Sequence, residues 1–228
     1  MSRIIKKKKT VLKLKTIRRI VMLPGPKIIK ECPECLKPFG QTTMSSGNTF
    51  GAKLWSDRKF DAPMMIESNR CGICPNCNFL IWIDKSIEID RVDLANLKTS
   101  KYSNLKSCES PRIDDYIKVL NDSDLSTKDE IYIRCKLLHT FNDYFRKGIP
   151  ESSSSDESKK NKLRLIDLLG NRQDDLLLKA EIYRELEDFI AALAILEGEF
   201  DESRQWVADK LNTLCLAENK DVVVLDNS

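Results

Sequence analysis

Two copies of the pattern Cys-Pro-x-Cys constrain this sequence more than any other feature. They lie at Cys32 and Cys35 and again at Cys74 and Cys77, with 38 residues between the copies. Two residues between thiols allow one tight turn to direct both sulfur atoms at the same ion, and two such turns complete a tetrahedral site. Four thiolates select a soft metal, and zinc is favoured over iron in a chain without redox motifs. The spacing therefore predicts one structural Zn²⁺ bound by these four cysteines, in a site closed to water and substrate.

A third cysteine makes the second cluster ambiguous. Cys71 precedes Cys74 by three residues, so the segment also reads Cys-x-x-Cys-x-x-Cys. Only Cys74 and Cys77 reproduce the proline-bearing turn of the first pair, so we interpret Cys71 as a neighbouring non-ligand. A spare ligand and a redox thiol stay open as alternatives. The other cysteines have no pair spacing and are predicted to be small buried side chains, namely Cys108, Cys135 and Cys215.

Cysteine usage also bears on the cellular compartment. Eight cysteines that cluster in Cys-x-x-Cys pairs indicate a metal site rather than a disulfide framework. No apolar run reaches the roughly 18 residues of a membrane span, and the first apolar stretch is interrupted by Lys and Arg, unlike a secretory signal. We therefore expect a cytoplasmic protein without a transmembrane segment.

Positive charge is concentrated at the N-terminus. Residues 1–30 hold 11 of the 38 Lys and Arg residues and none of the 35 acidic residues, which leaves 27 basic against 35 acidic residues elsewhere. A basic tail binds nucleic acid through counterion release, or it is simply a solvated arm. A further alternative is that Met22 is the first residue of the natural chain. The predicted organisation is a basic N-terminal tail at 1–30, a zinc-ribbon domain at 31–100 and a helical domain at 101–228.

Helical periodicity begins near Pro111 and resumes after a Ser-rich segment, 151–160, that we predict to be a mobile loop. Ser126 or Thr127 is a plausible N-cap for a helix that starts there. Further helices are predicted at 161–169, 173–186, 188–197 and 202–217. The apolar run 222–225 is interpreted as a short strand or as a segment packed on the body.

One helical pair has a recognisable pattern. Leu176, Ala180 and Tyr183 form a stripe on the first helix, and Ala192 and Leu196 continue it on the second. Small residues at a helix crossing resemble one tetratricopeptide repeat, which needs helices on both sides to bury its faces. Because no second copy is visible, an ordinary helical hairpin stays an equal alternative.

Catalytic motifs are scarce. His139 is the single histidine, and its helix neighbours Cys135 and Asp143 form a triad only on paper, because one helix face supplies no oxyanion pocket. The sequence contains no phosphate-binding loop and no His-Glu-x-x-His motif. These observations favour a protein that is not an enzyme.

Several segments together carry a family resemblance. They are the two Cys-Pro-x-Cys turns, the stretches Leu54–Asp57, Ala62–Met65 and Ile81–Asp84, and the later helical segment Ala180–Leu186. The chain resembles uncharacterised bacterial zinc-ribbon proteins with a tetratricopeptide-like helical C-terminal region. Such turns commonly carry Gly after the second cysteine, whereas this chain has Leu36 and Asn78. The resemblance implies architecture and zinc and implies no activity.

The predicted fold class is α+β, with a small β-rich zinc ribbon followed by an α-helical, tetratricopeptide-like bundle. The leading functional hypothesis is a non-enzymatic, zinc-binding protein-interaction module with a protein partner. A nucleic-acid-binding ribbon assisted by the basic tail is the first alternative. A metalloenzyme or thiol oxidoreductase is the second.

Overall fold

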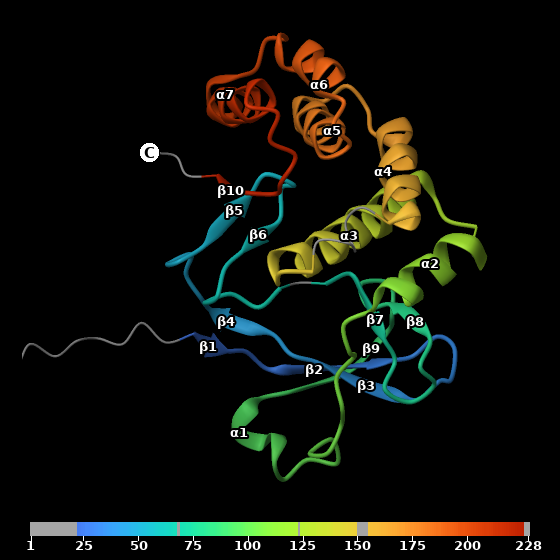
Figure 1. Cartoon of the computed structure of the whole chain (residues 1–228). Coiled ribbons are helices and arrows are strands. Elements are labelled where there is room, and N and C mark those ends of the chain that lie inside the picture. Colours follow the sequence, from blue (N-terminus) through green and yellow to red (C-terminus); the bar gives the residue numbers. More distant parts are fainter. Residues whose placement is uncertain (1–21, 68, 123, 150–154, 226–228) are drawn as a thin grey trace, which may run out of the picture.

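The computed structural model describes residues 22–67, 69–122, 124–149 and 155–225. Its N-terminal half is rich in short strands and its C-terminal half is helical (Figure 1), as the α+β prediction requires. The strands are β1 Leu23–Pro24, β2 Lys27–Glu31, β3 Pro38–Gln41, β4 Met44–Ser46, β5 Lys53–Trp55, β6 Phe60–Asp61, β7 Cys71–Ile73, β8 Leu80–Trp82, β9 Glu88–Val92 and β10 Val224–Leu225. The helices are α1 Leu94–Leu97, α2 Ile113–Asp122, α3 Thr127–Arg146, α4 Asp156–Leu168, α5 Gln173–Glu185, α6 Phe189–Leu196 and α7 Glu202–Leu216.

Within the described residues the strands form four small antiparallel sheets. Their orders are β3-β2-β9, β7-β8, β1-β4 and β10-β5-β6. In the first sheet β2 is the central strand, and its Ile29 side chain is fully buried. The predicted tail at 1–30 therefore ends too late, because its last residues form this strand. The adjacent β-branched residues Ile28 and Ile29 were the available signal. Residues 1–21 of the predicted tail lie outside the described residues.

The long helices agree with the periodicity, with one correction. Ser126 is the N-cap of α3, since its hydroxyl accepts a hydrogen bond from the backbone N–H of Asp129 at 3.3 Å. Helix α4 begins at Asp156, capped by Ser155, so the second half of the predicted loop 151–160 is helical. A serine N-cap followed by two acidic residues stabilises the first turn by satisfying its free N–H groups. Residues 151–154 lie outside the described part.

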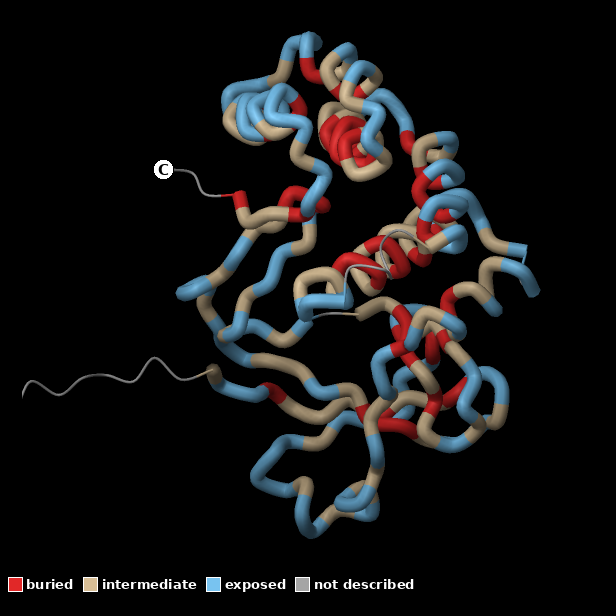
Figure 2. The backbone as a smooth tube through the Cα atoms, in the orientation of Figure 1, coloured by how far each residue is buried: buried red, intermediate tan, exposed pale blue. Residues whose placement is uncertain are grey.

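The helical half and the β-rich half share buried cores rather than forming separate units. Figure 2 shows buried residues along α3 and α5 and around β7 and β8. Cys71 packs with Ile133 and Leu137 of α3, and α5, α6 and α7 enclose a further core. The C-terminal run is a strand, since β10 pairs with β5 in the insert between the two cysteine pairs. The boundary predicted at residue 100 therefore separates two sequence patterns, but side chains from both sides of it pack in the same core.

Helices α5 and α6 form the predicted hairpin, and α7 packs against both. The face of α5 and α7 that turns toward β5 and β10 borders a cavity of about 300 Å³, lined by Leu177 and Val207 and by Trp55 and Leu225. The chain's own strands thus line one side of this groove beside α5 and α7. The resemblance of this hairpin to one tetratricopeptide repeat stays a prediction.

Candidate metal centre

The first cysteine pair lies in the turn that joins β2 to β3. The backbone N–H of Cys32 donates to the carbonyl of Lys37 at 3.0 Å, and the N–H of Leu36 donates to the carbonyl of Cys32 at 2.9 Å. These two bonds close a tight loop around the cysteines. The loop is short enough for the thiols of Cys32 and Cys35 to face the same point.

The second pair repeats this geometry in the turn that joins β7 to β8. Cys74 N–H donates to the carbonyl of Phe79 at 2.9 Å, and Asn78 N–H donates to the carbonyl of Cys74 at 3.0 Å. The backbone N–H of Asn76 also lies 3.4 Å from the sulfur of Cys74. The two Cys-Pro-x-Cys sequences therefore encode two equivalent turns, as their shared pattern predicts.

The two turns bring all four predicted thiols together. Their Sγ atoms all lie within 4.8 Å of one another, with Cys32 and Cys77 3.8 Å apart and Cys35 and Cys74 3.9 Å apart. A disulfide would need about 2.05 Å. Metal–sulfur bonds of about 2.3 Å in a tetrahedron place the sulfurs about 3.8 Å from each other. The Cys32–Cys77 and Cys35–Cys74 separations match those around a shared metal ion, and the four cysteines can therefore bind one.

Burial and hydrogen bonds affect the thiols differently. Burial raises the pKa of Cys32 to about 12. At Cys74 burial also opposes ionisation, but hydrogen bonds from the backbone N–H groups of Asn76 and Cys77, together with those from the thiols of Cys32 and Cys77, lower the pKa to about 7. A coordinating divalent ion deprotonates thiols outright, so a bound metal would hold Cys32 as a thiolate despite its raised pKa.

Both turns contain a residue in the left-handed region directly after the second cysteine. Leu36 has φ of 58° and Asn78 has φ of 60°. Asn tolerates this conformation, whereas a branched apolar side chain is strained there. These are the two positions where the resemblance suggested glycine.

Replacing Leu36 with glycine should stabilise the metal-loaded protein by about 1 kcal/mol. The left-handed conformation costs an L-residue about 1–2 kcal/mol, and glycine relieves this cost. The greater conformational freedom of glycine in the unfolded chain offsets part of the stabilisation. Little burial is lost, because Leu36 is 69% exposed. Urea denaturation measures the change. The matched control Lys37→Gly should be neutral or destabilising, and a destabilised Leu36→Gly would refute the strain argument.

Cys71 does not belong to the four-sulfur cluster of the described residues. Its buried side chain packs beside Tyr116 of α2 and Ile133 of α3. Cys108 packs instead against the buried core that contains Cys32 and Cys74. No local pattern predicted this contact, because Cys108 lies 31 residues beyond Cys77 and has no pair spacing.

The triad considered around His139 is not assembled. His139 Nε2 lies 3.0 Å from the backbone carbonyl oxygen of Asp57, while Asp143 pairs with Lys59 at 2.6 Å. Cys135 packs in the core between α3 and α5, where burial raises its pKa to about 12. Burial also lowers the pKa of His139, so the imidazole is neutral at pH 7. Its geometry is that of a packed side chain.

No helix in the described residues combines the length and apolar character needed to cross a membrane. Comparison of the sequence with protein-family models and with curated proteins, and of the fold with solved structures, finds no match. The site is therefore interpreted from its own geometry.

Proposed function

We propose that Cys32, Cys35, Cys74 and Cys77 hold one structural Zn²⁺ and that the chain is a non-enzymatic protein-interaction module. The observation that carries this proposal is the set of four sulfurs within 4.8 Å of one another, two pairs of which have the 3.8–3.9 Å separation of a tetrahedral S₄ site. Four protein ligands leave no position for water or substrate, which favours a structural over a catalytic ion. The family resemblance supports the same assignment. Reduced thiols suit the cytoplasm, which we propose as its compartment.

The ion would join the hairpin at β2 and β3 to the hairpin at β7 and β8. The second hairpin is in turn fixed to α3, where Arg70 and Lys85 both pair with Asp129, at 2.9 and 2.7 Å. Trp82 adds a ring contact with Tyr132, with centroids 5.8 Å apart. Metal binding would therefore order the β-rich half on the surface of the helical half.

The turns themselves present apolar side chains to solvent. Leu36 is 69% exposed and Phe79 is 53% exposed, each at or just after the left-handed residue of its turn. A strained backbone that carries an exposed apolar side chain suggests selection for an external contact. We propose that these two side chains contact the protein partner. The groove beside α5 and α7 is a weaker candidate for the partner-binding surface, because β5 and β10 already cover one side of it.

The test uses full-length, zinc-loaded protein with a photo-crosslinking residue at position 36. It should capture one discrete protein, and the double variant Leu36→Glu, Phe79→Glu should weaken the affinity for that purified partner at least tenfold. Ile190→Glu is a matched control, since Ile190 is 84% exposed on α6, and it should bind normally. Equal affinity of the double variant, or no crosslinked protein, would contradict the proposal.

Nucleic-acid binding is the second candidate. The ring of Phe79 lies 5.4 Å from the ammonium group of Lys118, an arrangement that suits base stacking beside a phosphate. The test requires deletion of residues 1–21 only, because residues 27–31 form β2. If the tail contributes, oligonucleotide affinity should be salt-sensitive and should fall with this deletion. Unchanged affinity would remove the tail from this alternative.

A further inference from the structure

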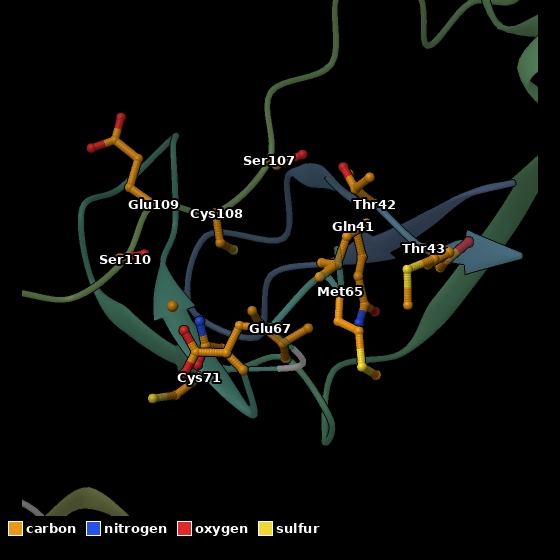
Figure 3. Close-up of a pocket in the computed structure, with 16 residues that line it drawn as sticks. Gln41, Thr42, Thr43, Met65, Glu67, Cys71, Ser107, Cys108, Glu109 and Ser110 are labelled. Atoms are coloured by element: carbon orange, nitrogen blue, oxygen red, sulfur yellow. The ribbon is translucent and has the colours of Figure 1, made fainter. Parts of the chain in front are cut away.

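A second site lies beside the metal cluster, in a cavity of about 470 Å³. Its walls come from the β3–β4 turn, the segment before β7, and the segment that leads to α2 (Figure 3). Its apolar and sulfur-bearing lining includes Met44, Met65, Ile83 and Cys108. The Cys108 side chain points into the cavity, while the carboxylate of Glu109 points away from it (Figure 3). A concave, mainly apolar cavity of this volume is typical of small-molecule sites.

A polar cavity of about 320 Å³ adjoins the first one. Glu67, Asn69 and Ser110 line both cavities, so the two meet at these residues. Beyond them the second cavity is bordered by α3 and by Arg112 and Tyr116 near the start of α2. The apolar cavity thus has a polar end.

That polar end is cationic. Its four basic side chains are Lys59, Arg112, Lys136 and Lys147, against the two acids Glu67 and Asp143. Both acids are already neutralised, because Glu67 pairs with Lys136 and Asp143 pairs with Lys59 and Arg146. Within the described residues, Arg112 and Lys147 form no ion pair with a carboxylate. Two cationic groups therefore remain to receive an anion.

From this arrangement we propose that the two cavities together bind one amphipathic carboxylate, with its hydrocarbon chain between Met65 and Cys108 and its carboxylate toward Arg112 and Lys147. An apolar chain gains by leaving water, and a carboxylate gains charge-assisted hydrogen bonds from a guanidinium group. A cationic amphiphile gains nothing at this end. The ligand class follows because an apolar cavity lies beside a cationic one.

The site rests in one respect on the proposed function. Ile83 and Cys108 belong to the core packed around the four metal-binding thiols and also line the apolar cavity. Removal of the metal should therefore open the wall that holds the hydrocarbon chain. Ligand binding and metal content must be measured separately on the same samples.

Titration calorimetry on zinc-loaded, full-length protein tests the site with decanoate, octanoate, decanol and decyltrimethylammonium. Decanoate should bind about fifteenfold more tightly than octanoate, since each buried methylene contributes about fourfold. It should also bind more tightly than decanol, and the cationic probe should not bind. Arg112→Gln should weaken decanoate about tenfold and leave decanol unchanged. Lys98→Gln removes the same charge from an exposed residue outside the site and should have no effect.

Blocking the apolar cavity gives an independent readout. Met65 is 41% exposed at the cavity wall, so Met65→Trp can fill the space without disturbing the core, and Met65→Leu conserves the volume. The first variant should abolish binding of both decanoate and decanol, and the second should retain it. Zinc-loaded protein that does not bind decanoate, or that binds it equally after Met65→Trp, would overturn the ligand proposal alone. Full decanoate binding by metal-free protein would overturn only the role given to the metal.

Discussion

Replacing Cys74 with serine is expected to release the metal and unfold the β-rich half of the protein. Cys74 is fully buried and its sulfur lies 3.9 Å from that of Cys35, so no other described side chain can take its place without moving the turn. Structural zinc contributes about 10 kcal/mol or more of apparent binding energy in small domains, and most of this energy would be lost. Metal content per chain and thermal unfolding by circular dichroism measure the two effects.

The controls are two cysteines that lie near the site. Cys108→Ser changes a thiol that packs against the cluster, and Cys71→Ser changes the thiol that made the sequence ambiguous. Both variants should retain one metal ion per chain. Loss of metal from Cys71→Ser together with retention in Cys74→Ser would show that the ligand set is wrong.

Replacing Asp57 with alanine should destabilise the protein by about 3 kcal/mol, because it removes the fully buried partner of Arg146 and leaves that guanidinium group paired only with the partly exposed Asp143. The Asp57 side chain is 0% exposed and lies 2.5 Å from the guanidinium group of Arg146, which is 9% exposed. Asn142 Nδ2 also donates to its carboxylate at 2.9 Å. The other face of Arg146 lies 4.4 Å from the ring centroid of Trp55. This cluster joins the insert between the cysteine pairs to α3.

Urea denaturation of zinc-loaded protein gives the free energy of unfolding. Asp61→Ala is the matched control, since Asp61 is exposed on the neighbouring strand and should change stability by less than about 0.5 kcal/mol. The double variant Asp57→Leu, Arg146→Met should recover part of the loss, because it removes both charges. Equal stability of Asp57→Ala and the wild type would mean that this ion pair does not fix the insert.

The metal-site geometry was predictable because its determinants are local. Each Cys-Pro-x-Cys turn is specified by four consecutive residues, and equal sequences gave equal turns at Cys32 and Cys74. The helices from Gln173 onward were also predictable, since their apolar stripes reflect a core that neighbouring helices share. In both cases the residues that determine one turn or one helix lie close together in the sequence.

Features that depend on distant partners were not predictable. The basic residues before Cys32 suggested a tail, whereas Lys27–Glu31 forms a central strand because β3 and β9 pair with it. The Ser-rich composition before Lys160 suggested a loop, but Ser155 caps α4. The contact between Asp57 and Arg146 joins residues 89 positions apart, and no local periodicity reports such a pair.

X-ray absorption spectroscopy of the purified, metal-loaded protein tests the central claim most directly. One zinc ion per chain with four sulfur neighbours at about 2.3 Å is the predicted result. A shell that contains nitrogen or oxygen, or fewer than four sulfurs, would contradict the proposed ligand set. Protein that folds fully without any bound metal would contradict the structural role itself.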